Sequence, residues 1–290
     1  DERGGCAVKK KTGLAEKGKA WRIATYVLLL FMILIAVFPA IWMLSTAIKS
    51  PVELYDMPPE IIPDEPTLGN FVSVLQNSKL YRAFFNSVVI TISVVALTLF
   101  FSVLAGYGFA RFKFKGSGVL KVGLLFGQMI PSVVIIIPLY FLFSKMKMLN
   151  SRASLVVADM ALTIPMGVIM LSSFFESVPR QLEEAAKIDG CTGIQALFRV
   201  VLPVAKPGMI SVAIYTFINA WEEFLFALNL TTSSKTRTLP IAISMFSGEF
   251  AVDWGATMAA AAVVALPVLL IFLLCNRYFV QGLSDGAVKG

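Results

Sequence analysis

The chain alternates between long apolar runs and short charged segments. Four runs contain no charged residue, and each is longer than the roughly 20 residues with which a helix crosses a bilayer. Two further runs, 154–175 and 209–231, are interrupted only by Asp159 and by the pair Glu222 and Glu223. The pattern predicts an all-α integral membrane protein with six transmembrane helices, at about 23–48, 84–110, 122–144, 154–175, 209–231 and 256–276.

The segment 50–81, between the first two predicted helices, divides into two halves. The first half is rich in proline and acidic residues, so we expect it to be extended and solvated. Thr67 is a plausible N-cap, and after it Leu68, Phe71 and Leu75 fall on one side of a short amphipathic helix. This helix either packs against the bundle or offers a docking surface to an external partner.

Composition agrees with a membrane protein: 57% of residues are hydrophobic and only 15% are charged, against about 25% in soluble domains. With a cytoplasmic amino terminus, about two thirds of the 25 Lys and Arg residues fall on the inner side, as the positive-inside rule predicts. We therefore expect a cytoplasmic basic tail (1–22), a six-span domain (23–281) and a cytoplasmic carboxyl-terminal tail (282–290). The loop with Lys145, Lys147 and Arg152 is unusually basic for an outer segment.

Several kinds of chemistry are disfavoured. The net charge of +7 arises beside the predicted helices, where it suits anionic lipid headgroups better than nucleic acid. There is no histidine, and Cys6, Cys191 and Cys275 imply neither a disulfide nor a metal site. A Gly-x4-Gly-Lys match at 13–19 lacks the Ser or Thr of a phosphate-binding loop, because Ala20 follows it. We expect no catalytic residue, metal or cofactor in this chain.

The inner connection 176–207 is charged and punctuated by Gly and Pro. Pro179 suits a first helical position, strong helix formers follow, and Gly190 can take the left-handed conformation that ends a helix. After Thr192 a second helix is predicted, with a single apolar stripe formed by Ile194, Leu197, Phe198 and Val201. Pro203 and Pro207 are expected to end it. This cytoplasmic helix–turn–helix has nearly balanced charge, which favours a protein partner.

The same connection carries a motif of fixed spacing: Glu184-Ala185-Ala186, three residues, Gly190, nine residues, Val200, one residue, Leu202-Pro203. It resembles the EAA loop of ABC-importer permeases, which has Ile in place of Val200. The segments AGYGFARFKFKG, IPSVVIIIPLYFLF, AWEEFLFAL and GAVKG extend the resemblance from Arg22 to the carboxyl terminus. The chain is similar to the maltose-type carbohydrate family, as its shorter six-span partner. It departs from that pattern with Glu222 instead of Asn, and Cys191 instead of Ala.

This resemblance implies an ATP-driven, binding-protein-dependent importer for a sugar or oligosaccharide in the bacterial cytoplasmic membrane. Two permease subunits, the second a non-identical chain, would form the path. A dimer of ATP-binding subunits, which hold ATP and Mg, would lie beneath them, and an extracytoplasmic solute-binding protein would deliver the cargo. This chain itself would not be an enzyme.

The resemblance also implies roles for individual residues. The residues expected to couple to the ATPase are Glu184, Ala185, Ala186, Asp189, Gly190, Leu202 and Pro203. The tail residues expected to reach between the ATPase subunits are Gly286, Lys289 and Gly290. A side chain at position 190 would disturb the turn that aims both short helices.

A substrate pathway is expected along the fifth predicted helix. Asn219, Glu222, Phe226 and Asn229 recur on one helical face, with Glu223 beside it and Trp221 available for stacking. The alternative for the two acids is polar packing against the partner permease. For Asp159 we expect solvation at a helix end, and for Gly123 and Gly127 close helix packing.

Other transport classes fit less well. A secondary transporter commonly has internal repeats and ion-coupling residues at mid-membrane, and no repeat is visible in this sequence. A channel needs a filter-like element, which is also missing from the sequence. An ABC permease for another small solute is the nearest alternative.

Overall fold

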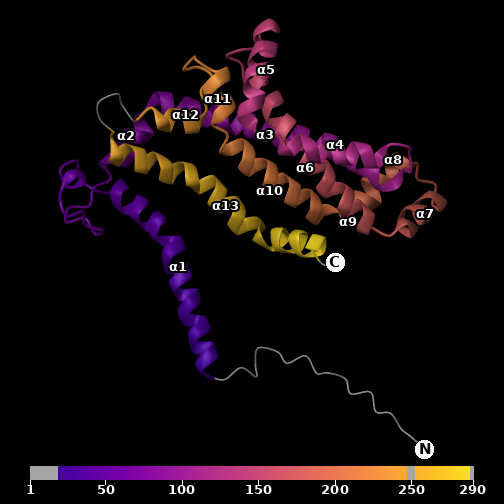
Figure 1. Cartoon of the computed structure of the whole chain (residues 1–290), viewed down its shortest axis with the longest axis horizontal. Coiled ribbons are helices and arrows are strands. Elements are labelled where there is room, and N and C mark those ends of the chain that lie inside the picture. Colours follow the sequence, from indigo (N-terminus) through magenta and orange to yellow (C-terminus); the bar gives the residue numbers. More distant parts are fainter. Residues whose placement is uncertain (1–18, 247–251, 288–290) are drawn as a thin grey trace, which may run out of the picture.

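The computed structural model describes residues 19–246 and 252–287, with side chains for 21–246 and 252–275. These residues form helices joined by loops, so the predicted all-α fold is confirmed (Figure 1). The α-helices are α1 (Lys19–Ala47), α2 (Gly69–Gln76), α3 (Ser78–Arg111), α4 (Ser117–Met129), α5 (Ser132–Lys145), α6 (Arg152–Ser177), α7 (Arg180–Ile188), α8 (Gly193–Ala196), α9 (Leu202–Val204), α10 (Lys206–Trp221), α11 (Leu225–Leu230), α12 (Leu239–Ser244) and α13 (Trp254–Ala287).

Four of these helices, α1, α3, α6 and α13, are long and apolar enough to cross a membrane without interruption. The predicted span 122–144 is instead divided between α4 and α5, which meet at 96°. Pro131 has no N–H and restricts the residue before it, so Ile130 is extended and α4 ends there. The predicted span 209–231 is also divided, because three residues separate the end of α10 at Trp221 from the start of α11 at Leu225.

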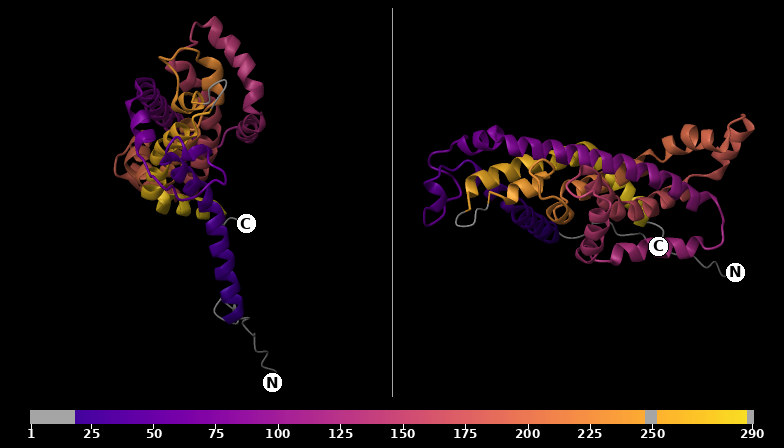
Figure 2. Two further views of the ribbon diagram at one scale, coloured as in Figure 1. Left: turned by 90° about the vertical axis from the view of Figure 1, so that its left-hand side faces the viewer. Right: turned by 90° about the horizontal axis from the view of Figure 1, so that it is seen from above.

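The helices are arranged along one direction. α7 and α8 lie at one end of the molecule, α2 and α12 lie at the other, and α3 runs between them (Figures 1 and 2). α1 leaves the bundle and projects away from it, with its contacts to the rest of the chain made chiefly to α13. The apolar residues of α1 between Tyr26 and Ile35 are all about half exposed or more. Exposed apolar side chains of this kind are stable in contact with lipid.

The segment 50–81 is joined to the bundle through α2, which is one of the two arrangements that its sequence allows. Thr67 does not cap α2 as its N-cap residue, but its hydroxyl accepts a hydrogen bond from Gly69 N (3.1 Å). Val74 is buried against α3 and α13, while Leu68 and Leu75 remain exposed. Asn70 Nδ2 donates to the carbonyls of Ala47 and Lys49, and so ties α2 to the end of α1. α2 therefore packs against the bundle.

The contact between α3 and α6 is the most extensive in the described chain. Hydrogen bonds join these elements at three levels: Asn86 with Arg152, Thr98 with Thr163, and Arg111 with Val178. The interval between partners stays at 65 to 67 residues, so the two helices run parallel and in register. Small residues at points of this seam, such as Ser102, Gly106 and Gly167, allow the backbones to approach closely.

Glycines are required at two places in this packing. A Cβ on Gly167 would lie 2.4 Å from Ser102 Oγ and 3.3 Å from Val212 Cγ1. A Cβ on Gly106 would lie 3.1 Å from the backbone nitrogen of Ser172. Gly123 and Gly127, by contrast, have no neighbouring heavy atom within 4 Å of an added Cβ, so close packing within this chain occurs at other glycines than those predicted.

We predict that Gly167→Val destabilises the protein by about 1–3 kcal/mol, because the added methyl groups overpack the seam between α3, α6 and α10. The measurement is the melting temperature of the protein in mild detergent. Gly123→Val makes the same change where space is open and is expected to leave Tm within a degree or two. Equal melting temperatures for the two variants would contradict the assignment of close packing to Gly167.

Candidate functional site

The predicted helix–turn–helix is formed by α7, α8, the π-helical turn Leu197–Val201 and α9, which we call the coupling loop. Gly190 has φ +88° and ends α7, and its N–H donates to Lys187 O (3.1 Å). Pro179 is the N-cap of α7 and not its first helical residue. Thr192 and Gln195 form a reciprocal capping box that starts α8. Local sequence therefore fixes the turn between the two arms.

A buried ion pair attaches this loop to the transmembrane bundle. Arg111 Nε, at the carboxyl-terminal end of α3, lies 2.5 Å from Glu183 Oε1, and both side chains are less than a tenth exposed. Tyr107 OH donates to the other carboxylate oxygen (2.8 Å), and Arg111 Nη2 also donates to Val178 O (3.0 Å). Every polar atom of the Glu183 carboxylate thus has a partner, and α7 is held to α3.

The predicted apolar stripe is divided between two faces. Leu197 and Val201 are buried among residues of α3 and α6. Ile194 and Phe198 are 72% and 57% exposed, and Ile194 lines a cavity beside the end of α3. Ile188, on the adjoining α7, is 87% exposed. The π-helical turn rotates the side chains relative to a regular helix, and Pro203 lies inside this arm, which ends at Ala205. The arm therefore ends between Pro203 and Pro207, the two prolines expected to end it.

The residues assigned to ATPase coupling occupy different positions on the loop. Glu184, Ala185, Asp189, Gly190 and Pro203 are exposed, Leu202 is half-buried, and Ala186 is buried. Glu184 also lines a cavity of about 820 Å³ between the loop and the carboxyl-terminal end of α3. Asp189 and Gly190 lie at the turn, whereas Pro203 belongs to α9 in the second arm. The exposed members therefore do not share one face of the loop.

Of the three tail residues predicted to reach the ATPase, the structure describes one. Gly286 belongs to the last turn of α13. Lys289 and Gly290 lie outside the described residues.

The predicted pathway residues do not form one helical face, because the helix is broken at 222–224. Asn219 and Asn229 are exposed and donate to carbonyls of their own helices, Tyr215 O and Leu225 O. Phe226 is 1% exposed and belongs to the core between α5, α6 and α11. A face drawn on a continuous helix cannot describe this segment.

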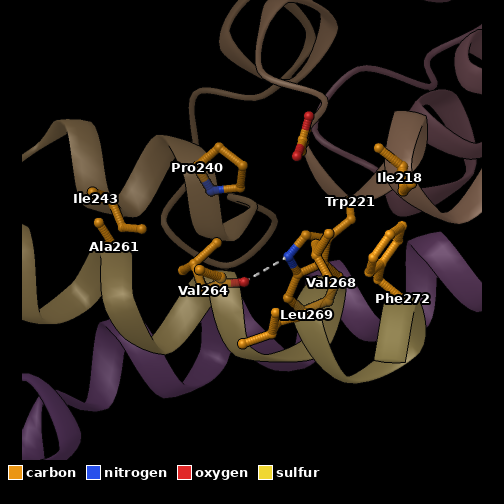
Figure 3. A pocket seen from close by; sticks show the side chains of 11 residues that line it. Ile218, Trp221, Pro240, Ile243, Ala261, Val264, Val268, Leu269 and Phe272 are labelled. Carbon is orange, nitrogen blue, oxygen red and sulfur yellow. Dashed lines mark hydrogen bonds between the residues drawn. The ribbon is translucent and has the colours of Figure 1, made fainter. Parts of the chain in front are cut away.

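Trp221 packs inside the bundle instead of offering a stacking surface. Its ring is 2% exposed, stacks on Phe217 and meets Phe84 edge-on. Its indole N–H donates to Val264 O of α13 (3.1 Å; Figure 3). Beside it lies an apolar cavity of about 630 Å³, formed by α10, α12 and α13, to which Glu222 contributes the acidic side chain.

The two remaining acids are held in contrasting ways. Glu223 accepts hydrogen bonds from the backbone N–H groups of Phe226 and Ala227, so it caps α11. Asp159 is 3% exposed, and its Oδ1 has no hydrogen-bond partner among the described residues. Solvation at a helix end, expected for Asp159, is therefore wrong, because α3 and α11 cover this part of α6.

The site residues that sequence reasoning missed are Arg111 and Glu183. A signal exists for each: Arg111 is the first charge after an apolar run, and Glu183 directly precedes the spaced Glu-Ala-Ala motif. Neither signal reveals that they pair, because 72 residues separate them.

Comparison with known proteins now decides the family. The model for the binding-protein-dependent transport system inner membrane component matches residues 98–285. The chain belongs to this family. It is thus a permease subunit of an ABC transporter, not an enzyme, and a multi-pass inner-membrane protein.

Individual relatives agree. The sulfoquinovosyl glycerol transport system permease protein SmoH of Agrobacterium fabrum is 39% identical, covering 87% of this chain and 89% of that protein. The trehalose/maltose transport system permease protein MalG of Thermococcus litoralis is 33% identical, covering 93% and 97%. A chain in the crystal structure of a bacterial ABC transporter that imports the acidic polysaccharide alginate has the same fold, with a TM-score of 0.80 at 20% identity over 92% of this permease and 99% of that chain.

We predict that Arg111→Ala destabilises the permease by about 3–5 kcal/mol, because it leaves the buried carboxylate of Glu183 without its cation. Lys121→Ala is the matched control, since it removes the cation of the exposed Lys121–Glu176 pair and should cost less than about 1 kcal/mol. Thermal unfolding in detergent compares the two. A similar small loss in both variants would contradict the anchoring role of the buried pair.

Proposed function

We propose that this permease is the membrane-spanning subunit of an ATP-driven, binding-protein-dependent importer for a sugar or oligosaccharide, and that the coupling loop docks on the ATPase. One observation carries the proposal: the loop is anchored to α3 by a buried ion pair, while its opposite side is apolar and uncovered by the described chain. Such a combination suits an element that receives a partner on one side and transmits its movement to the other.

The uncovered side has the character of a protein interface. Ile188, Ile194 and Phe198 are large, exposed and carried by elements that contact one another. Exposed polar residues, including Glu184 and Asp189, accompany them. An apolar centre with a polar margin is the usual composition of a protein interface. We assign this surface to a groove on the ATP-binding subunit, which holds ATP and Mg.

Rigidity makes the loop effective in coupling. The turn at Gly190 needs a left-handed backbone, the capping box fixes the start of α8, and Leu197 and Val201 anchor the second arm in the core. Movement of the ATPase is therefore transferred to α3 and α6 instead of being absorbed by the loop.

The carbohydrate cargo is supported by the relatives. Their names include sulfoquinovosyl glycerol, diacetylchitobiose and trehalose/maltose, all of them sugars or sugar derivatives. The complete assembly in this proposal has two permease subunits, the second a non-identical chain, two ATP-binding subunits and an extracytoplasmic solute-binding protein. Both termini of this permease are placed in the cytoplasm, with 23–281 as the permease domain.

The proposal is tested by purifying the tagged permease from its native membrane in mild detergent, as the wild type, as Ile188→Asp with Phe198→Asp, and as Gln181→Asp. Wild type and Gln181→Asp, which adds charge elsewhere on α7, should retain an ATP-binding subunit and a second permease. The double variant should retain the second permease and lose the ATP-binding subunit. A wild-type protein that purifies alone and transports sugar without ATP would refute the importer function.

We predict that Gly190→Val lowers ATP hydrolysis stimulated by the cargo-loaded binding protein at least tenfold in the reconstituted importer, because a β-branched side chain at φ +88° strains the turn. Gly116→Val is the control, since Gly116 has φ +93° and belongs to a different inner loop. It should retain stimulation within about twofold. Comparable losses in both variants would indicate a general effect of strain and not a role in coupling.

A further inference from the structure

Two loops at the end of the molecule opposite the coupling loop are bonded into one surface with the start of α3. Asn86 Nδ2 donates to the carbonyls of Lys235 (3.0 Å) and Arg237 (2.9 Å), and Asn86 Oδ1 accepts from Arg152 Nε (2.9 Å). Asn86 is fully buried. One side chain therefore joins α3, the start of α6 and the loop between α11 and α12.

A second asparagine fixes the same loop from the other side. Asn150 Oδ1 accepts from the backbone N–H groups of Thr232 (2.7 Å) and Ser233 (2.9 Å), and Asn150 N donates to Leu230 O (3.0 Å). Two side chains thus determine the course of 231–238 and hold it against the segment 145–152. We call the surface made by 77–82, 145–152 and 231–238 the outer basic platform.

All the charges of this platform are positive. Its charged residues are Lys79, Arg82, Lys145, Lys147, Arg152, Lys235 and Arg237. No ion pair joins any of them to a carboxylate of the described residues. Arg152 lies over the ring of Phe85 (5.5 Å), and Arg237 donates to Thr232 O and Met245 Sδ. A fixed surface with this much uncompensated charge attracts an anionic partner.

The platform also contains a shaped recess. A cavity of about 330 Å³ is lined by Lys79 and Arg237 together with the polar Asn77 and Ser234, and its other walls, including Phe246, are mainly apolar. Among the described residues, its lining contains no acid. Two cations above an apolar wall suit a carboxylate on a short aliphatic stem, which is the chemistry of a Glu or Asp side chain.

We propose that the outer basic platform docks an acidic surface of the solute-binding protein, and that one carboxylate of that protein enters the recess between Lys79 and Arg237. This inference rests on the proposed function, which places the platform outside the membrane. The fixed backbone of 231–238 favours a partner that also has a fixed shape, since a fluid lipid headgroup layer needs no such order.

An anionic cargo fits the chain less well than an acidic protein surface. The fifth span and the neighbouring α6 contain three acids within their apolar runs, Asp159, Glu222 and Glu223, and α10 and α11 carry no cation beyond Lys206 at the start of α10. An anionic sugar attracted to the platform would then meet carboxylates inside the membrane. The positive charge is therefore assigned to docking and not to selection of the cargo.

The test uses the complete importer in nanodiscs and its purified, cargo-loaded solute-binding protein. Lys79→Glu combined with Lys235→Glu reverses two exposed charges of the platform, and Lys235 accepts the bond from Asn86 only through its backbone. The control reverses Lys113 and Lys115 in the loop between α3 and α4, on the coupling-loop side of α3. Kd is measured by biolayer interferometry over a range of salt concentrations.

We expect the platform variant to bind the solute-binding protein at least tenfold more weakly than wild type, with a flatter salt dependence, and the control to stay within about twofold. Photocrosslinking from position 234 identifies the acidic residue of the binding protein that lies beside Ser234. Replacing that acidic residue with Lys should restore the affinity for the platform variant and for no other variant. Unchanged affinity and salt dependence in the platform variant would overturn the proposal. So would an effect on the KM for cargo alone, or an effect seen only in nanodiscs that contain anionic phosphatidylglycerol.

Co-purification distinguishes failure of this inference from failure of the proposed function. If the ATP-binding subunit accompanies the permease and the platform variant still binds normally, only the docking surface is wrong. If no ATP-binding subunit accompanies the wild type, the importer function itself fails.

Discussion

The parallel packing of α3 against α6 is the constraint on which the other features of this permease depend. Gly106 and Gly167 allow the two backbones to approach, and paired hydroxyls of Thr98 and Thr163 satisfy each other in the middle of the seam. α3 carries Asn86 near one end and Arg111 at the other. The side chain that orders the outer basic platform and the side chain that anchors the coupling loop therefore belong to a single helix. Because packed interfaces deform little, the two surfaces are expected to move together.

The rest of the bundle is joined to this seam less extensively. α1 contacts chiefly α13, and α5 packs on the short α11. Their outward apolar residues are stable in lipid, because hydrocarbon tails are as apolar as leucine side chains. Exposure of these helices is therefore not evidence of a missing protein neighbour. What the contacts do show is a division between a rigid seam, which holds both functional surfaces, and peripheral helices with few contacts to restrain them.

Local features of this fold could be predicted from the sequence, and features that depend on distant neighbours could not. The apolar runs predicted the helices, and the turn at Gly190 and the cap at Thr192 follow from the residues themselves. The burial of Glu183 depends on Arg111, 72 residues away, and the burial of Trp221 depends on α13. For the same reason, the predicted stripe on the coupling loop was divided: α3 and α6 cover Leu197 and Val201 and leave Ile194 and Phe198 exposed.

The break in the fifth span explains why two adjacent acids have different roles. A helix interrupted at membrane depth leaves backbone N–H groups without acceptors, and such groups are costly in a medium without water. Glu223 supplies both carboxylate oxygens to the N–H groups of Phe226 and Ala227, and so makes the start of α11 possible there. The Glu223 carboxylate therefore serves the fold as the cap of α11. Glu222 is exposed and lines the cavity beside Trp221, with no backbone group to satisfy. Of this pair, therefore, Glu222 is the acid whose carboxylate the fold leaves exposed, and its place on a substrate pathway stays a prediction.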